Sequence, residues 1–210
     1  TPIPTGSVTS GLNGVSCTAA DACWAVGDYA LAAPINQTWP LVTRLGSAAA
    51  PSPVLTPTPV PVGGTESNFE DPDCPTATAC WAVGGTQIGS ARRAMVMRSA
   101  GNTWGLVPTP SPPGATKSEL RGVDCVTASA CWAVGNATVG GLKRAMIMRW
   151  NGTAWSLAAT PVIESSFLDD VSCVSVTFCL AVGHRTDGTA DSDSLVMRSE
   201  EHTSELQSRL

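Results

Sequence analysis

The sequence predicts an all-β fold built from repeated units of four short antiparallel strands. Four segments share one pattern, in which two cysteines separated by five residues are followed by Trp-Ala-Val-Gly or Leu-Ala-Val-Gly; they begin at Cys17, Cys74, Cys125 and Cys173. Apolar runs bounded by Gly, Pro, Asn and Ser recur at the same places around each segment, and no stretch has a helical period. These observations indicate a tandem β repeat.

Each unit contains four predicted strands in the same order. The first precedes the first cysteine, as in Leu12–Cys17, and the second is the Cys-Trp-Ala-Val-Gly run, which ends at its glycine. The third ends at an arginine, as in AMVMRS and AMIMRW, and the fourth follows a tryptophan, as in Trp104–Pro110 and Trp155–Pro161. Gly-Asn or Asn-Gly between the third and fourth strands is a hairpin turn signal. The units are roughly 50 residues long, a period typical of propeller blades and similar arrays.

The cysteines predict a disulfide within each unit. All eight belong to the four repeated pairs, and a unit that recurs must satisfy its own bonding locally, so the simplest pairing crosses the first hairpin. The alternatives are buried free thiols and a zinc site, although zinc sites use shorter cysteine spacings and a second ligand pair. Disulfides imply an oxidising compartment, which predicts a secreted or cell-surface protein. The predicted pairs are Cys17–Cys23, Cys74–Cys80, Cys125–Cys131 and Cys173–Cys179.

The composition restricts the partners. Hydrophobic residues make up 43% of the 210 residues, charged residues make up 14%, and the net charge is -5. Without a basic patch to neutralise phosphates, we expect no nucleic-acid partner. The longest apolar runs, such as Ala94–Met97, are of strand length, so we expect no membrane span. Nothing in the sequence calls for a cofactor.

The repeat register predicts where the units begin and end. A Thr-Pro pair marks the end of each fourth strand, and Thr1-Pro2 fits the same place, so we expect residues 1–7 to end a missing preceding unit. The tail SEEHTSELQSRL replaces the expected tryptophan strand and resembles the translation of a DNA-sequencing adapter. We therefore expect a single repeat domain over residues 1–198, with three complete units and one truncated unit: 8–58, 59–109, 110–160 and 161–198. Residues 199–210 are interpreted as a non-native tail, the alternative being a genuine polar C-terminus.

With these motifs, residues 1–198 resemble tandem repeats of secreted bacterial proteins of β-propeller type, and they are similar to kelch blades. Kelch blades have glycines after strand two and a tryptophan in strand four; here only Gly84-Gly85 forms a double glycine. The resemblance implies an incomplete β-propeller-like array of four-stranded antiparallel blades. It implies no specific activity, because propellers carry unrelated functions.

Two repeated side chains are interpreted as packing residues. The tryptophan after the second cysteine is replaced by leucine in the fourth unit, which favours packing between blades over an exposed surface for sugar stacking; the residues are Trp24, Trp81, Trp132 and Leu180. The arginines of the third strands could surround an anion, but pairing with local carboxylates such as Asp124 or Asp170 is favoured; the arginines are Arg44, Arg98, Arg149 and Arg198.

The loops between the second and third strands vary among the units and are the predicted ligand face. Candidate ligand-binding residues there are Arg93, Arg144, His184 and Asp187. Asp187, Asp191 and Asp193 form a weak candidate Ca²⁺ site, the alternative being a solvated acidic loop. Three glycosylation sequons begin at Asn36, Asn136 and Asn151, a pattern common by chance.

No catalytic constellation is present, since the sequence has no Gly-x-Ser-x-Gly elbow, phosphate loop or carboxylate pair beside a histidine. We therefore expect a non-catalytic module that binds a glycan or a protein at the loop face, or that serves as a scaffold. The alternative is a fragment of a propeller glycosidase or lyase whose catalytic residues lie in missing blades.

Overall fold

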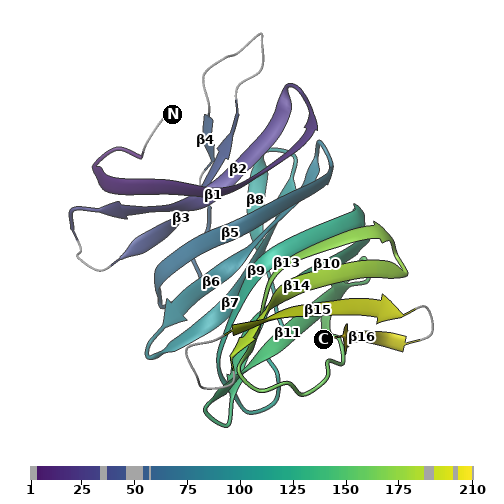
Figure 1. Cartoon of the computed structure of the whole chain (residues 1–210). Helices are drawn as coiled ribbons and strands as arrows, with labels where there is room; N and C mark the ends of the chain where they lie inside the picture. The colour runs from purple at the N-terminus through teal and green to yellow at the C-terminus, as the bar shows by residue number, and fades with distance from the viewer. Residues whose placement is uncertain are drawn as a thin grey trace. The chain divides into compact units, whose positions relative to one another are not determined.

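The computed structural model describes residues 4–33, 37–45, 54–56, 58–186, 192–200 and 203–209, and within them it contains strands and turns but no helix. The all-β prediction is therefore confirmed. The chain forms two compact units, Thr1–Val107 and Pro108–Leu210, which are described separately. Each unit consists of antiparallel sheets whose strands follow one another in chain order (Figure 1).

In the first unit, two four-stranded meanders are joined by one parallel bridge between Thr38 and Glu66. The strands of the first sheet are β1 (Ser7–Ala19), β2 (Ala22–Leu31), β3 (Thr38–Arg44) and β4 (Val54–Thr56). Those of the second sheet are β5 (Gly64–Thr76), β6 (Ala79–Ile88), β7 (Ala91–Ala100) and β8 (Thr103–Val107).

The second unit repeats this plan in two separate four-stranded sheets. The strands of the third sheet are β9 (Ala115–Thr127), β10 (Ala130–Val139), β11 (Leu142–Trp150) and β12 (Trp155–Leu157). Those of the fourth sheet are β13 (Ser166–Ser175), β14 (Phe178–Thr186), β15 (Ser192–Glu200) and β16 (Thr203–Arg209).

The fourth sheet differs from the predicted truncated unit. Thr203–Arg209 of the predicted non-native tail pairs antiparallel with β15, as β16. The edge of β15 presents backbone N–H and C=O groups that an extended segment can pair with. Strand pairing of this kind depends on the backbone, and it explains how a segment outside the repeat pattern completes the sheet.

The sequence predicts that the second strand ends at the glycine of the Ala-Val-Gly motif. In the structure the strand continues past this glycine. In the third sheet, Gly135 lies inside β10, opposite a register shift in β9. A Cβ on Gly135 would lie 2.1 Å from the carbonyl oxygen of Glu119. The corresponding glycines of the other sheets meet a first-strand carbonyl at 2.0 or 2.1 Å: Gly27, Gly84 and Gly183. The repeat therefore keeps glycine because a β-bulge brings two backbones together.

Because the strands continue past this glycine, two of the connections between second and third strands are short turns. β6 and β7 are joined by Gly89 and Ser90, and β10 and β11 by Gly140 and Gly141. These glycines have φ values of 59°, 63° and 85°, which only glycine adopts readily in such a turn. The segments GTQIGSARR and NATVGGLKR, predicted as loops, are thus mostly strand.

The core of each unit lies between its two sheets. In the first unit, Trp24, Val26 and Val42 pack against a set on the second sheet that includes Phe69, Ala82, Met95 and Met97. In the second unit, Trp132, Val134 and Ile147 pack against Leu168, Ala181, Leu195 and Met197. The interpretation of the tryptophans as packing residues is confirmed by burial at Trp24, Trp81 and Trp132. Leu180, at the same position of the fourth sheet, is 38% exposed, so packing there stays a prediction.

The first strands of the paired sheets approach most closely. A Cβ on Gly14 in β1 would lie 3.2 Å from the Cα of Asp71 in β5, and one on Gly122 in β9 would lie 2.9 Å from the Cα of Asp170 in β13. Hydrogen bonds cross the same seam, since the N–H of Cys74 donates to Ser16 Oγ at 3.0 Å. In the second unit, the N–H of Cys173 donates to Asp124 Oδ2 at 2.7 Å.

All four predicted disulfides are confirmed. Each joins the two strands of the first hairpin of a sheet, with Cα–Cα distances of 3.9 to 4.0 Å. None of the eight cysteines, all of which lie in the described part of the chain, is free. Four local disulfides indicate an oxidising environment.

Candidate functional site

The repeated arginines pack on aromatic rings. Arg98 lies over the ring of Trp81, with its Cζ 5.2 Å from the ring centroid, and Arg149 lies over Trp132 at 5.6 Å. Each arginine is directly opposite its tryptophan in the strand register. Such contacts are favourable cation–π interactions. The predicted carboxylate partners accept backbone N–H groups instead: Asp124 and Asp170.

The other two arginines also have local contacts. Arg198 lies over the ring of Phe178 at 4.8 Å. Arg44 Nη1 donates to Asn102 Oδ1 at 3.4 Å, so it connects the first sheet to a turn of the second. These contacts account for the four arginines without an anionic ligand.

The predicted ligand-binding residues lie on strands rather than loops. Arg93 is in β7, Arg144 in β11 and His184 in β14, whereas Asp187 lies outside the described residues. Arg93 and Arg144 occupy the same position in their repeats, two residues before a buried methionine. His184 lies elsewhere, so the structure places only two of these residues equivalently.

The predicted Ca²⁺ site stays a prediction, because Asp187 and Asp191 are also outside the described residues. Asp193 lies in β15, where its Oδ2 accepts from Arg185 Nη2 at 3.0 Å. Within the described ranges, no group of three or more His, Cys, Asp or Glu side chains is arranged to hold a metal ion.

The sequons divide between buried and turn positions. Asn136 is only 4% exposed and donates to Glu119 Oε1 at 3.0 Å, so its amide is committed inside the sheet. Asn151 Oδ1 accepts from the N–H groups of Thr153 and Ala154 and stabilises a turn. Asn36 is not among the described residues.

Polar side chains gather along the first strands of the first unit. Asp28 in β2 lies near Asn13, Glu70 and Arg92. Burial raises the pKa of the Asp28 carboxyl, as does the charge of Glu70, while Asn13 and Arg92 oppose the rise. Asp28 is therefore a carboxylate whose charged form is disfavoured by folding.

Replacing Asp28 with asparagine is expected to stabilise the protein near pH 7. Since the folded pKa is raised, the favourable contribution of protonated Asp28 is complete below its unfolded pKa and is lost as pH rises through the folded pKa. The gain in the free energy of unfolding should thus shrink toward pH 3. Urea unfolding of Asp28→Asn across this range tests it, with Asp21→Asn in an exposed turn as the control; an equal gain at both pH values would contradict it.

A second polar cluster occupies the corresponding strands of the second unit. Arg121 Nη1 donates to Asp169 Oδ1 at 3.1 Å and Nη2 lies 3.5 Å from Glu119. Asp169 Oδ2 is 3.0 Å from His184 Nδ1, and the His184 ring stacks on Phe167 at 4.6 Å. The side chains of the Arg121–Asp169 and His184–Asp169 pairs are 39 to 42% exposed, so they contribute little stability.

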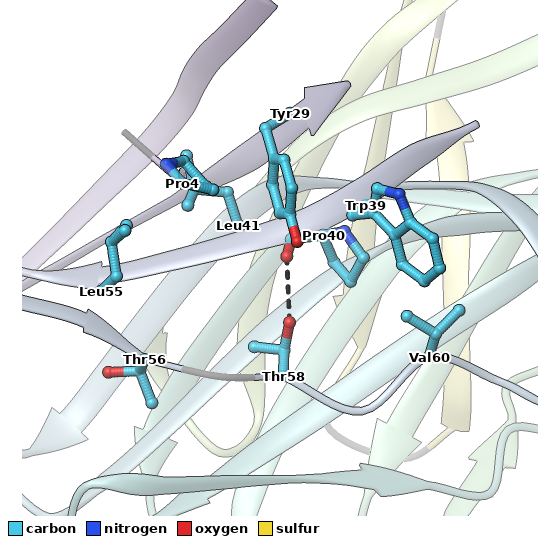
Figure 2. A pocket seen from close by; sticks show the side chains of 9 residues that line it. All are labelled: Pro4, Tyr29, Trp39, Pro40, Leu41, Leu55, Thr56, Thr58 and Val60. Carbon is cyan, nitrogen blue, oxygen red and sulfur yellow. Dashed lines mark hydrogen bonds between the residues drawn. The ribbon is translucent and has the colours of Figure 1, made fainter. Parts of the chain in front are cut away.

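A pocket of about 280 Å³ opens in the first unit beside the segment that follows β4. Tyr29 and Trp39 are directly opposite each other on β2 and β3 and are both half-buried. Figure 2 shows their rings beside Pro40 and the segment that carries Thr58, whose Oγ1 donates to the Pro40 carbonyl at 2.9 Å. We call this the Tyr29–Trp39 pocket; the other lining residues are Pro4, Leu41, Leu55, Thr56 and Val60.

The Tyr29–Trp39 pocket is aromatic and uncharged. None of its nine described lining residues is acidic or basic. Trp39 Nε1 is shielded from solvent, so the N–H is out of reach of a ligand in the pocket. An uncharged lining with two aromatic rings suits a neutral ligand that has an apolar face.

The second unit has an equivalent pocket of about 240 Å³ with different chemistry. Arg144 is directly opposite Ala137, as Trp39 is opposite Tyr29. We call this the Arg144 pocket; it is otherwise lined by Pro112, Pro113, Ala137, Val139, Ala145, Met146, Ile147, Leu157, Ala158, Thr160, Pro161 and Val162. The two pockets therefore lie at the same place in the repeat, and they differ in the side chain at one position, tryptophan in one and arginine in the other.

Comparison with known proteins finds similarity in structure but not in sequence. No protein-family model matches the chain, and no curated protein matches it in sequence. A solved structure described as YCF48 bound to D1 peptide is similar over 96% of this chain and 83% of that chain, with 12% identity and a TM-score of 0.31. At this TM-score the likeness adds nothing to the account of the pockets.

No helix in the described part of the chain is long and apolar enough to span a membrane.

Proposed function

We propose that this chain is a secreted or cell-surface, non-catalytic repeat module of β-propeller type that binds a neutral carbohydrate. The Tyr29–Trp39 pocket carries this proposal, since it combines two half-buried aromatic rings with a lining that has no charged residue. The four disulfides support export to an oxidising compartment.

The sheets support the propeller-like architecture with kelch-like, four-stranded blades. Within each unit, consecutive sheets pack face to face while their first strands approach closely, as the innermost strands of blades do. Apolar positions that are buried between sheets are exposed on two outer faces, such as Leu12 on the first sheet and Val196 on the fourth. A further sheet of the same kind would cover either face, so we propose an incomplete array in which residues 199–210 have no functional part.

The chemistry of the pocket favours a sugar. One face of a pyranose ring presents C–H groups that pack on an aromatic ring. A volume of about 280 Å³ is near the lower end of the range for ligand pockets, roughly 300–1,000 Å³, and suits one or two sugar units. An uncharged lining favours neutral over acidic sugars.

Replacing Trp39 with alanine is expected to weaken glycan binding at least tenfold, because the ring on which the sugar packs is lost. The wild-type chain is first screened against neutral oligosaccharides, and the best ligand is titrated calorimetrically against both proteins. Arg144→Ala, at the equivalent position of the other pocket, is the matched control and should bind as the wild type does.

Absence of any neutral glycan ligand, or equal binding by Trp39→Ala, would contradict the proposal. Cleavage of a bound oligosaccharide would instead support the alternative, a fragment of a propeller glycosidase or lyase. If the ligand proves to be a protein whose binding also depends on Trp39, the proposed site would be correct and the proposed ligand class would be wrong.

A further inference from the structure

The Arg144 pocket combines one cation with apolar walls. Arg144 is the only charged residue among the described residues that line it. Most of the others carry aliphatic, thioether or proline side chains, including Met146, Leu157 and Val162. A ligand that fits this pocket must therefore combine an apolar body with at most one anionic group.

The guanidinium of Arg144 is the group of this pocket that can pair with an anion. Its Nε is shielded from solvent, so a ligand would meet the other guanidinium nitrogens. An arginine presents its N–H groups as a planar fork that matches a carboxylate. Glu164 pairs with Arg144 through the backbone as an isolated antiparallel bridge, and Glu164 is exposed.

We propose that the Arg144 pocket binds a small organic carboxylate with an apolar body. The carboxylate pairs with the Arg144 guanidinium, and the apolar part packs between Met146, Leu157 and the proline-rich segment. This site lies in the second unit and does not depend on sugar binding in the Tyr29–Trp39 pocket. It also explains why the repeat tolerates tryptophan at one of these positions and arginine at the other, since that side chain sets the class of ligand.

Benzoate is a suitable probe, with benzyl alcohol as its uncharged analogue. Carbon-13 methyl NMR of the full chain should show saturable shifts at Met146, Ala158 and Val162 when benzoate is added. Benzyl alcohol and inorganic phosphate should each bind at least tenfold more weakly, because the first lacks the charge and the second lacks the apolar body.

Variants connect this binding to Arg144. Arg144→Gln should weaken benzoate binding at least tenfold, and Arg144→Lys should weaken it less, because lysine keeps the charge but not the fork. Arg149→Gln, in the same strand but stacked on Trp132, is the matched control and should leave binding unchanged. Glu164→Gln, an exposed substitution that should preserve the fold, is expected to tighten binding about twofold by removing a nearby negative charge.

Several results would overturn the proposal. These are an absence of benzoate shifts at the pocket methyls of the wild type, equal binding of benzyl alcohol, and equal binding of phosphate. Unchanged affinity in a folded Arg144→Gln variant would do the same. If Arg144→Gln fails to fold, Arg144→Lys decides, since unchanged benzoate affinity in that variant would show that the guanidinium fork does not hold the carboxylate.

Discussion

Gly135→Ala is expected to lower the free energy of unfolding by about 3 kcal/mol or more, whereas Gly105→Ala should change it by less than about 1 kcal/mol. The added Cβ at position 135 would lie 2.1 Å from the carbonyl oxygen of Glu119 and 2.8 Å from the Cα of Leu120. Both are backbone atoms of the neighbouring strand, so the overlap is relieved only by breaking the bulge. A Cβ on Gly105, in contrast, meets nothing within 4 Å.

Urea unfolding followed by circular dichroism measures both variants against the wild type. Gly105 lies in β8 and has no positive φ, so it is a matched strand glycine without the bulge. Equal stability of the two variants would show that the strands separate at little cost near Glu119. It would also remove the structural reason for the glycine in the Ala-Val-Gly motif.

The same glycine shows how far the sequence could predict the fold. The repeat, the local disulfides and the buried tryptophans follow from spacing and alternation, because each unit must solve the same packing problem. Gly27 and its equivalents were interpreted as strand ends, since glycine is rare in strand interiors. Where the partner strand has a bulge, however, a glycine is needed inside the strand. The position of the bulge depends on the register between two strands, which cannot be read from either segment alone.

The candidate site was predicted only in part for the same reason. Arg93 and Arg144 were chosen as variable loop residues, and the structure places both in strands, at the position that Trp39 occupies in the first sheet. The sequence analysis missed Trp39 and Tyr29 because the first sheet has a longer connection between its second and third strands. The extra residues hide the alignment of this repeat with the others. This position lies two residues before the first buried leucine or methionine of the third strand. Aligning the repeats on that residue would have revealed it, because the side chain there varies while its neighbours do not.

Ile147→Lys is expected to destabilise the second unit by roughly 3–5 kcal/mol, whereas Val196→Lys should change its stability by only about 0.5 kcal/mol. The two residues occupy the same repeat position on β11 and β15. Ile147 is 1% exposed and packs between the third and fourth sheets, so a lysine there would bury an unpaired charge. Val196 is 39% exposed, so its lysine would reach water.

The comparison of Ile147→Lys with Val196→Lys separates packing between sheets from packing within one sheet. Because both positions lie opposite a valine of the second strand, Val134 or Val182, a difference in the free energy of unfolding reports mainly what the adjacent sheet contributes. Urea unfolding gives that difference, and sedimentation velocity at several concentrations shows whether Val196→Lys alters self-association. A large loss of stability in Val196→Lys would mean that the outer face of the fourth sheet is covered in solution. The array would then be closed or paired, and the proposed incomplete propeller with a free outer face would be wrong.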